Sequence, residues 1–380
     1  MKKFLKKIGR NRWNRYLRYI RSFYFELFDL IGEGVFGFLR ILRAIKPILP
    51  FEKNSVKKIL VIRLDRIGDL ILSTPVFKAL RGGFPQAKIY LLVQSYTLDL
   101  VINNSNLDGV LVLGKDKIPG DFDLAIALHP GYKQNQIAFQ SGARFRIGYT
   151  GSGGGFFLTR KVKDDRQIRI RHEVVSGLEL AKIAGCSIEV IKPEVSFTEK
   201  GELFGQDFFE RNGLFGKYPI VAIHPGARQE YIRWNSSGFA EVASRLMQEF
   251  GSQVILIGSG NEKLIIEEIV SLMPIKPIIS LDLALTELVS LIKRCSLFIG
   301  NSSGPMHIAA ALDVPVVGIF GNIHPLDSYQ EWGPWGNKHL VVSVNLKCKD
   351  CHPGDCRDFQ CMKLITPEMV FAAVKKQIKA

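Results

Sequence analysis

The sequence predicts an α/β protein built on two doubly wound parallel sheets. After Pro50, short apolar runs rich in β-branched residues alternate with helix-length amphipathic stretches, which is the pattern of βαβ units on a buried parallel sheet. The alternation starts near Lys57 and again near Tyr218. A chain of 380 residues with 47% hydrophobic residues has room for two ordinary domains. We therefore expect two Rossmann-like halves, each binding ligands where its strands end.

The apolar runs define the elements of each half. Strands of the first half are expected at 57–64, 88–94, 109–114 and 122–129, and an amphipathic segment runs from His172 to Gly185. In the second half, strands are expected at 219–226, 252–260, 276–280, 296–301 and 314–321, with helices near 237–250, 261–272, 285–294 and 304–312. Thr366 as N-cap and Pro367 as first residue open a final helix that reaches Lys379.

These elements divide the chain into four parts. We expect a helical arm at 1–50, a first domain at 56–213, a second domain at 214–345 and a Cys-rich segment with the last helix at 346–380. The arm holds 12 Lys and Arg residues against three acidic ones, a net charge of +9, whereas the whole chain carries +15. Apolar residues recur in it every three to four positions, which indicates a basic amphipathic helix.

Such an arm suits an anionic membrane surface, with Lys and Arg toward headgroups and apolar side chains toward acyl chains. Glu26, Asp29 and Glu33 interrupt its apolar stretch, so neither a secretory signal nor a spanning helix fits. The alternatives are a helical extension packed on the chain's own body or on a partner subunit, and a nucleic-acid partner. No nucleic-acid motif occurs elsewhere in the sequence, so we expect no nucleic acid to bind.

Four of the six cysteines lie close together near the C-terminus. Cys348, Cys351, Cys356 and Cys361 form the pattern C-x2-C-x4-C-x4-C. Four thiolates could hold zinc or an iron–sulfur cluster, but the spacing matches neither paired CxxC units nor a ferredoxin pattern. Reduced thiols and one or two disulfides remain as alternatives. The sequence therefore favours a chain that binds no metal here.

The first strand leads into RLDRIGDLILSTP, where a Rossmann-like domain turns from strand to helix. A dinucleotide site would need G-x-G-x-x-G at this turn, and only Gly68 is present, which disfavours a nicotinamide-dependent dehydrogenase. Asp69 follows at the helix N-terminus. Its carboxylate could cap the helix, or it could take a proton from a hydroxyl as a general base. Asp65, four residues earlier, is the rival candidate for the base.

In the second half, Asn301-Ser302-Ser303-Gly304-Pro305-Met306-His307 forms the turn between a strand and an Ala-rich helix. A serine can cap the helix, Gly304 lets backbone approach a ligand, and Pro305 starts the helix without losing a hydrogen-bond donor. Free N–H groups at a helix N-terminus bind anions, so a diphosphate is the expected ligand. An ordinary capped helix, with His307 as a packing residue, is the alternative.

Three other segments carry candidate binding residues. After the strand at 219–226 come Arg228 and Arg233, whose guanidinium groups suit phosphate. The next strand ends in Gly258, which could approach a nucleoside, and Glu262 is placed to accept ribose hydroxyls. The stretch 151–173 is rich in Gly and then in Lys and Arg, which indicates a mobile loop that either binds an anionic group or is only solvated.

At these residues the sequence resembles glycosyltransferase family 9, the ADP-heptose:lipopolysaccharide heptosyltransferases. The resemblance runs from about Lys57 to the C-terminus and omits only the arm. Its most specific blocks are R-x-x-x-x-GD-x-x-x-x-TP, which contains Arg63, Gly68 and Thr74, then Pro225–Ala243, and Ser303–Gly321. The Cys-rich tail also resembles that of many members.

The resemblance implies a GT-B fold, with a nucleotide sugar, ADP-heptose, bound by the second half and a lipid-linked or lipopolysaccharide-type acceptor by the first. It implies inversion at the anomeric carbon without a metal or other cofactor, in an enzyme peripheral to the cytoplasmic membrane at its inner face. Asp69 stands where the family has its general base, and Ser303, Gly304 and His307 stand where it binds the leaving diphosphate. Expected donor-side neighbours are Ser302, Pro305, Met306, Arg228, Arg233, Gly258 and Glu262, and expected acceptor-side residues are Arg63, Gly68, Thr74, Arg169 and Arg171.

Two positions depart from the family pattern. The family usually has Asp where this chain has Ser302, and a phosphate-contacting Lys where it has Ile232. Arg228 or Arg233 could replace that lysine. The departures leave two alternatives open, which are a different nucleotide sugar and a GT-B protein that binds a nucleotide sugar with weakened turnover.

Overall fold

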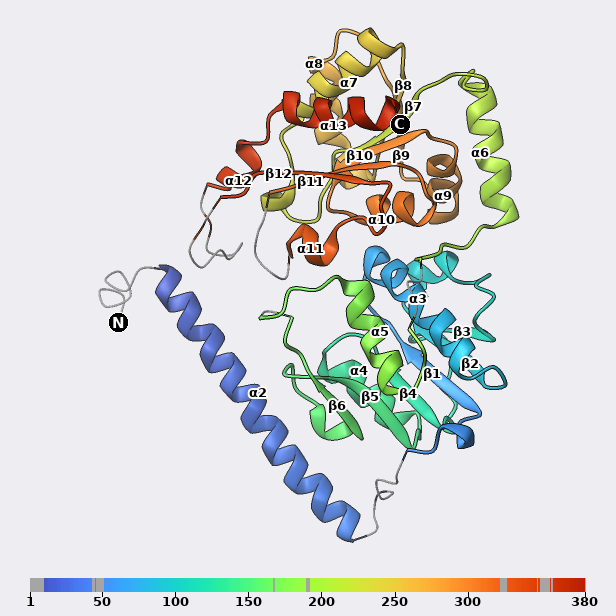
Figure 1. Cartoon of the computed structure of the whole chain (residues 1–380), viewed down its shortest axis with the longest axis vertical. Coiled ribbons are helices and arrows are strands. Elements are labelled where there is room, and N and C mark those ends of the chain that lie inside the picture. The colour runs from blue at the N-terminus through green and yellow to red at the C-terminus, as the bar shows by residue number, and fades with distance from the viewer. Residues whose placement is uncertain are drawn as a thin grey trace.

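A computed structural model describes residues 10–42, 45, 51–166, 168–188, 192–321, 327–346, 348, 356 and 358–379. It contains two six-stranded parallel sheets, one in each half of the chain, with helices on both faces of each sheet (Figure 1). This confirms the predicted fold class. The two halves lie end to end, and the N-terminal helix runs along the side of the first half (Figure 1).

The first sheet has the strand order β3-β2-β1-β4-β5-β6 and the second the order β12-β11-β10-β7-β8-β9, so the two halves share one topology. The strands of the first sheet are β1 (Lys58–Ile62), β2 (Lys88–Val93), β3 (Gly109–Val112), β4 (Leu124–Ala127), β5 (Phe145–Thr150) and β6 (Arg160–Lys163). Those of the second are β7 (Ile220–His224), β8 (Gln253–Gly258), β9 (Ile278–Leu281), β10 (Leu297–Asn301), β11 (Val316–Phe320) and β12 (Leu340–Ser343). In each half, the strand order reverses beside the first strand of that half.

Helices connect these strands and cover both sheets. They are α2 (Arg10–Ile41), α3 (Ile67–Gly83), α4 (Tyr132–Gln140), α5 (Glu173–Ile183), α6 (Glu199–Arg211), α7 (Ser236–Phe250), α8 (Lys263–Leu272), α9 (Leu285–Lys293), α10 (Gly304–Ala311), α11 (Tyr329–Trp332), α12 (Gln360–Lys363) and α13 (Pro367–Lys379). The last helix starts at Pro367 and ends at Lys379, as expected from the sequence. The nine strands expected from the sequence are all present.

Three strands were not expected. β5 contains Arg146 and Gly148, which break its apolar pattern, and β6 consists of the residues RKVK at the sheet edge. β12 forms the edge of the second sheet. Because β6 lies inside 151–173, the expectation of a mobile loop there is wrong in part: the 3-10 helix η3 (Gly155–Phe157) is buried and the chain then pairs with β5.

Helix α6 falls within the stretch expected for the first domain, but it packs on α9 of the second half. Glycines allow the close approach, since a Cβ built at Gly205 would lie 2.1 Å from the Ser290 hydroxyl and one at Gly201 would lie 2.5 Å from the Thr286 carbonyl oxygen. Arg294 of the second half also donates to the Glu202 carboxylate at 2.9 Å. By its contacts, α6 therefore belongs with the second half.

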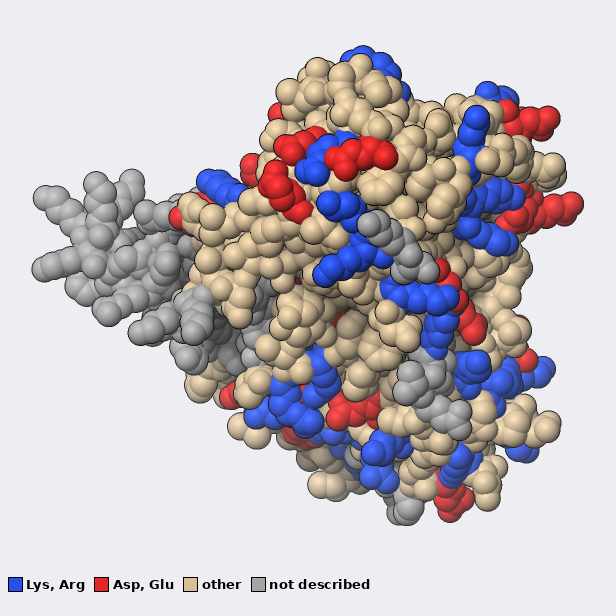
Figure 2. Space-filling model, turned by 45° about the horizontal axis from the view of Figure 1, so that its top comes forward, with Lys and Arg blue, Asp and Glu red and all other residues tan. Residues whose placement is uncertain are grey.

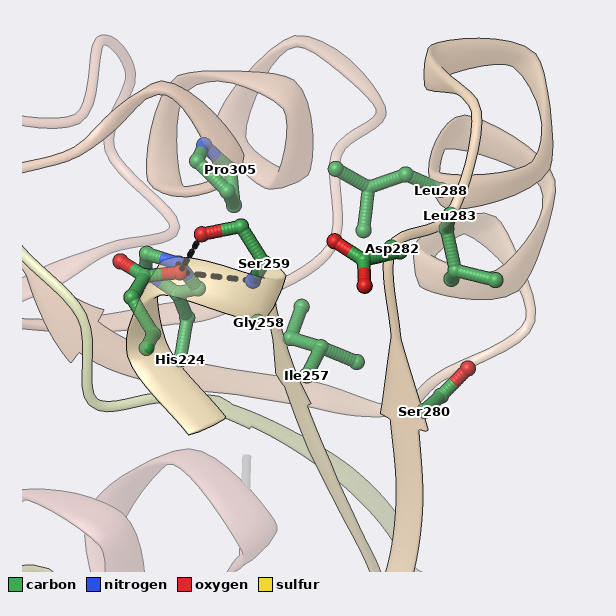
Figure 3. A pocket seen from close by; sticks show the side chains of 10 residues that line it. His224, Ile257, Gly258, Ser259, Ser280, Asp282, Leu283, Leu288 and Pro305 are labelled. Atoms are coloured by element: carbon green, nitrogen blue, oxygen red, sulfur yellow. Dashed lines mark hydrogen bonds and ion pairs between the residues drawn. The ribbon is translucent and has the colours of Figure 1, made fainter. Parts of the chain in front are cut away.

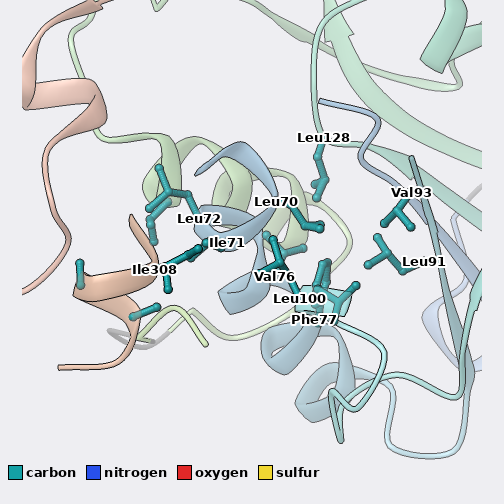
Figure 4. Close-up of a cluster of buried hydrophobic side chains, with 14 of the residues drawn as sticks. Leu70, Ile71, Leu72, Val76, Phe77, Leu91, Val93, Leu100, Leu128 and Ile308 are labelled. Atoms are coloured by element: carbon teal, nitrogen blue, oxygen red, sulfur yellow. The ribbon is translucent and has the colours of Figure 1, made fainter. Parts of the chain in front are cut away.

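Helices α3 and α10 join the two halves. Ile308 of α10 lies beside Ile71 and Leu72 of α3 in a hydrophobic cluster that continues from one half into the other (Figure 4). At the N-terminal ends of the same helices, a Cβ at Gly68 would lie 2.6 Å from the His307 ring, and a Cβ at Gly304 would lie 2.9 Å from the Ile67 side chain. The two helix N-termini are therefore in direct contact.

The N-terminal arm forms helix α2, and one face of this helix packs on the first half. This agrees with the alternative that the arm is a helical extension packed on the chain's own body. Phe36 contacts the rings of Phe139, Phe156 and Phe157, with centroids 5.1 to 5.3 Å apart. Residues 1–9 of the arm lie outside the described residues. In the part of the chain that the structure describes, no helix is long and apolar enough to cross a membrane.

Candidate functional site

A cleft of about 520 Å³ lies between the two halves, where the carboxyl ends of both sheets meet. It lies beside the points where the strand order reverses, which is where open α/β sheets bind ligands. On the face drawn in Figure 2, Lys and Arg side chains lie on both sides of the hollow between the halves. The cleft is lined by Arg66, Ile67, Gly68, Asp69, Tyr96, His129, His224, Ala227, Arg228, Ile232, Glu262, Ser302, Ser303, Gly304, Pro305, His307, Asp327 and Trp332.

On the side of the first half, Asp69 stands in the first turn of α3. One carboxylate oxygen accepts a hydrogen bond from the Arg66 backbone N–H at 3.3 Å, and the other accepts one from the Arg63 guanidinium at 3.1 Å. The carboxylate thus caps its own helix and still lines the cleft. It can accept a proton from a hydroxyl that enters the cleft.

Arg63 is buried and holds three carboxylates from behind the cleft. Its Nη2 donates to Glu173 at 2.8 Å as well as to Asp69, and its Nε lies 3.3 Å from an Asp65 oxygen. Burial lowers the pKa of Arg63, but Glu173, Asp69 and Asp65 together raise it above its ordinary value. Arg63 therefore stays charged, and it orients Asp69 rather than contacting a ligand as the sequence suggested.

Asp65, the rival base, does not line the cleft. Its carboxylate lies 3.3 Å from Arg63 Nε and 3.6 Å from His129 Nδ1, and Gln134 Nε2 donates to it at 3.4 Å. Burial lowers the pKa of His129 despite the nearby Asp65 charge. Asp69 lines the cleft and Asp65 does not, so the geometry favours Asp69 over Asp65 as the candidate base.

On the side of the second half, α10 begins at Gly304 with Pro305 in its first turn. The N-cap residue Ser303 makes no side-chain hydrogen bond to its helix, and its hydroxyl is buried without a hydrogen-bond partner among the described residues. No acidic residue stands in the first turn. The positive end of the helix dipole and the free N–H groups therefore face the cleft, which suits an anion.

His307 lies in the same turn and is almost fully buried. Burial, together with the proximity of His172, lowers its pKa to about 3, although Asp69 opposes the shift. A neutral imidazole can donate one hydrogen bond and carries no charge. The Nδ1 atom has no hydrogen-bond partner among the described residues.

Basic side chains reach the cleft from both halves. Arg228 follows β7 as the sequence predicts, and Arg66 comes from the first half, at the N-cap of α3. Ile232 also lines the cleft, so the position where the family usually has a lysine carries an apolar side chain here. Of the two arginines expected to replace it, only Arg228 is in place. Arg233 lines a separate cavity beside Trp234 and Lys363.

A second pocket of about 260 Å³ adjoins the cleft and shares His224, Glu262 and Pro305 with it (Figure 3). Glu262 accepts hydrogen bonds from the Ser259 N–H and hydroxyl at 2.8 and 2.9 Å, and lies 3.5 Å from His224. Burial opposes ionisation, but these partners lower the pKa of Glu262 to about 2. Ile257, Leu283 and Leu288 give this pocket apolar walls (Figure 3).

Several expected site residues lie elsewhere. Met306 is buried in the core beneath α10 and does not line the cleft. Thr74 is also buried and accepts a hydrogen bond from the Glu194 N–H. Arg171 is paired with Asp165 and Glu179, whereas Arg169 is largely exposed, and neither lines the cleft.

The structure also places residues in the site that the sequence did not single out. His129 ends a predicted strand, and Tyr96 and Asp282 each follow a predicted strand by two residues, so their position at the carboxyl edge of a sheet could have been inferred. Arg66 stands inside the quoted RLDRIGD block. Asp327 and Trp332 carry no comparable sequence signal, since neither directly follows a predicted strand and no motif contains them.

No group of three or more His, Cys, Asp or Glu residues that could hold a metal ion occurs among the residues the structure describes. Cys348 and Cys356 are exposed, whereas Cys351 lies outside the described residues, as does His352. The expectation for the cysteine cluster therefore stays a prediction.

The family model for glycosyltransferase family 9 (heptosyltransferase) matches residues 113–360. The chain belongs to glycosyltransferase family 9. This family 9 chain is 28% identical over 333 residues to lipopolysaccharide heptosyltransferase 3 of Escherichia coli, covering 81% of this chain and 94% of the relative. It is 24% identical over 316 residues to the lipopolysaccharide core heptosyltransferase OpsX of Haemophilus influenzae, covering 78% and 87%.

Solved structures share the fold of this family 9 glycosyltransferase. The family 9 glycosyl transferase from Veillonella parvula superposes with a TM-score of 0.76 at 22% identity, over 88% of this chain and 99% of that one. ADP-heptose lipopolysaccharide heptosyltransferase II of E. coli gives 0.70 at 23% identity, over 85% and 98%. The chain is therefore a glycosyltransferase with the two-domain GT-B fold.

Proposed function

We propose that the protein transfers a heptose from ADP-heptose to a hydroxyl of a lipopolysaccharide-core-type acceptor, with inversion at the anomeric carbon. The observation that carries the proposal is the meeting of Asp69 with the uncapped N-terminus of α10 in one cleft. A base on one side and an anion site on the other are what an inverting transfer to a hydroxyl requires.

Each half contributes one part of the reaction. The second half holds the donor, with the nucleoside in the pocket of Figure 3 and its ribose hydroxyls on the ionised Glu262. The diphosphate lies at Ser303 and Gly304, with Arg228 and Arg66 beside it. Negative charge grows on the diphosphate as the glycosidic bond breaks, and prearranged N–H donors stabilise it there.

The first half binds the acceptor, and Asp69 takes its proton as the hydroxyl oxygen attacks the anomeric carbon. Arg63 holds the Asp69 carboxylate in place from the buried side. The bond to the diphosphate oxygen breaks as the new glycosidic bond forms on the opposite face. Every step is assigned to side chains and backbone N–H groups of the protein, and no metal ion is part of the proposal.

A thermal-shift screen of nucleotide sugars, followed by a transfer assay, tests the proposal. A ligand that binds only the native state raises the apparent unfolding temperature. We expect ADP-heptose and ADP to raise it more than UDP, GDP or CMP do, and ADP-heptose to be consumed only when acceptor is present. A larger shift with another nucleotide would reject ADP-heptose as the donor.

Ile232 favours one alternative, because it places an apolar side chain where the family usually has a cation. A protein that keeps the cleft but turns over weakly would bind ADP-heptose tightly and form no product. Transfer at an ordinary enzymatic rate excludes that alternative.

We further propose that the enzyme works at the cytoplasmic face of the inner membrane, where a lipid-linked acceptor would lie. The net charge of +9 in residues 1–50 supports this, since polybasic segments bind anionic lipid. Binding of the full chain to vesicles that contain phosphatidylglycerol should weaken as NaCl rises from 0.1 to 0.5 M. Salt-independent binding would argue against the electrostatic part.

A further inference from the structure

Helix α2 contacts the first half along one face, and those contacts fix its rotation. Asp29 accepts a hydrogen bond from the Gly155 N–H at 3.0 Å, and Glu33 forms an ion pair with Lys161. A Cβ at Gly32 would lie 2.1 Å from a ring atom of Phe156, so helix and ring are in direct contact. With Phe36 in its aromatic cluster, these contacts hold one helical face against η3 and α4.

The other face of α2 is apolar, and its large side chains are exposed among the residues that the structure describes. Large side chains recur on it every three to four residues, and Glu26 is the only exposed charged residue between Phe23 and Leu42. Nothing lies within 4 Å of a Cβ at Gly34 or Gly37, among the residues described. We call this surface the outer face of α2, and its large exposed side chains are Phe23, Tyr24, Leu27, Leu30, Ile31, Val35, Phe38, Ile41 and Leu42.

The outer face is larger than an ordinary surface patch. Nine large side chains exposed by 40 to 79% present on the order of 1,000 Å² of mostly apolar surface. The largest patch on a soluble monomer is typically about 300 to 600 Å². A surface of this size on one helix indicates an interaction site.

We propose that the outer face of α2 lies in the surface of an anionic lipid bilayer, with the helix parallel to the membrane. The arm before it supplies the complementary charge, since residues 2–21 hold nine Lys and Arg residues and no acidic residue. A helix with one apolar face and a basic segment binds at the headgroup boundary without spanning it. A parallel pair of α2 helices from two copies would bring the basic segments together, which disfavours a second copy as the occupant.

This proposal rests on the proposed membrane association and adds the role of each face of α2. One face packs on the first half, and the outer face contacts the bilayer. Because α2 is held against the half that carries Asp69, the acceptor side of the enzyme is placed on the bilayer and the donor half stands away from it (Figure 1). A lipid-linked acceptor then enters the cleft from the membrane side, while the nucleotide sugar enters from water.

The test compares two double variants of the full chain by co-sedimentation with vesicles of phosphatidylethanolamine and phosphatidylglycerol, and with vesicles of phosphatidylcholine. Leu30→Gln/Phe38→Gln changes the outer face, and Leu203→Gln/Leu264→Gln makes the same kind of change at exposed positions of α6 and α8. Burial of each large apolar side chain is worth about 1.5 to 3 kcal/mol, which is about tenfold or more in binding. We expect the first variant to lose at least tenfold in binding to the anionic vesicles, and the second to match wild type.

Three results would overturn the proposal. They are equal vesicle binding by both variants, equal binding to neutral and anionic vesicles by wild type, and a dimer in sedimentation equilibrium that only Leu30→Gln/Phe38→Gln dissociates. Both variants should keep the wild-type unfolding temperature and ADP-induced thermal shift. If wild type binds vesicles as expected but shows neither an ADP shift nor transfer, the proposed function fails while this membrane surface stands.

Discussion

The N-termini of α3 and α10 meet in the cleft, and each follows one of the two strands between which the order of its sheet reverses. The capping of the two helices is nevertheless opposite. In α3 the chain supplies its own anion, since Asp69 caps the first turn and Arg63 balances its charge from the core. In α10 the cap residue makes no hydrogen bond to the helix, and no acid stands in the first turn. The difference teaches that a helix N-terminus beside the point where the strand order reverses can present either a base or an anion site, depending on the side chains of its first turn.

The largest expected effect comes from removing the carboxylate at the N-terminus of α3. Asp69→Asn keeps a side chain that can accept a hydrogen bond at the cap but cannot serve as the base, so we expect transfer to fall by about 10²- to 10⁴-fold. Binding of ADP should change little. Initial rates with ADP-heptose and acceptor measure the loss, with Asp65→Asn as the matched control that keeps most activity. Near wild-type transfer by Asp69→Asn would remove Asp69 from the mechanism.

Removing the buried counter-charge of α3 should destabilise the protein. Arg63→Met leaves Asp69, Asp65 and Glu173 without their shared partner, and breaking such a buried pair costs about 3 to 5 kcal/mol of unfolding free energy. The control is Arg211→Met, which removes an exposed ion pair with Asp207 one helical turn away and should cost no more than about 1 kcal/mol. Urea unfolding measures both. Equal losses of unfolding free energy in the two variants would show that Arg63 is not an important buried counter-charge for these carboxylates.

A carboxylate placed at the N-cap of α10 would make this helix N-terminus resemble that of α3. In Ser303→Asp the new carboxylate caps the helix, which should stabilise the protein by about 0.5 to 2 kcal/mol. The same charge repels the diphosphate, so the Kd for ADP should rise about 10- to 100-fold, as 1.4 to 2.8 kcal/mol of repulsion would give. Calorimetric titration with ADP measures the affinity. Asn235→Asp, at the N-cap of α7 outside the cleft, adds the same charge and should leave Kd unchanged.

The smallest effect concerns Glu331 of α11, which lies against the charged network behind α3. Both its carboxylate oxygens are buried without a hydrogen-bond partner among the described residues. Burial raises its pKa to about 8, with Glu173, Asp164 and Asp327 adding to the shift and Arg166 opposing it. The folded protein therefore holds this proton more tightly than the unfolded chain does.

Stability from this group is then fully present below about pH 4.5, and it is lost as pH rises to about 8. Glu331→Gln mimics the protonated carboxyl. We expect its unfolding free energy to match wild type at pH 5 and to exceed it at pH 9 by roughly 1 to 3 kcal/mol, the cost of an unsatisfied buried group. An equal difference between the two proteins at both pH values would contradict the raised pKa.

The sequence predicts the buried strands well, because their apolar runs are continuous and their turns carry glycine or a cap. It fails at β6, whose residues RKVK carry three charges, since an edge strand is stabilised by its pairing with β5 rather than by burial. Likewise, periodicity marks α2 as amphipathic but does not separate Phe36, which packs on the protein, from Phe38, which faces outward. That distinction depends on tertiary contacts with η3.

The sequence likewise identifies some residues of the candidate site correctly and misplaces or misses others. Asp69, Ser303, Gly304 and His307 were found because a motif and a strand end coincide at each of them, and all four line the cleft. Arg233 and Met306 were assigned by proximity in sequence, but adjacent residues on a loop or helix point in different directions. Trp332 was missed because α11 reaches the cleft from a segment without any recognisable pattern.

The contact of Gly68 with His307 and of Ile67 with Gly304 has a consequence for engineering. A half could be exchanged with the matching half of a relative to recombine donor and acceptor preferences, since solved relatives share the fold. The loops of such a chimera would determine which substrates it binds. The contacts of Gly68 with His307 and of Ile67 with Gly304 would determine how its two halves are positioned relative to each other. A larger residue at Gly68 or Gly304 would wedge the halves apart, so compatible residues at these two positions are the first condition for a working hybrid.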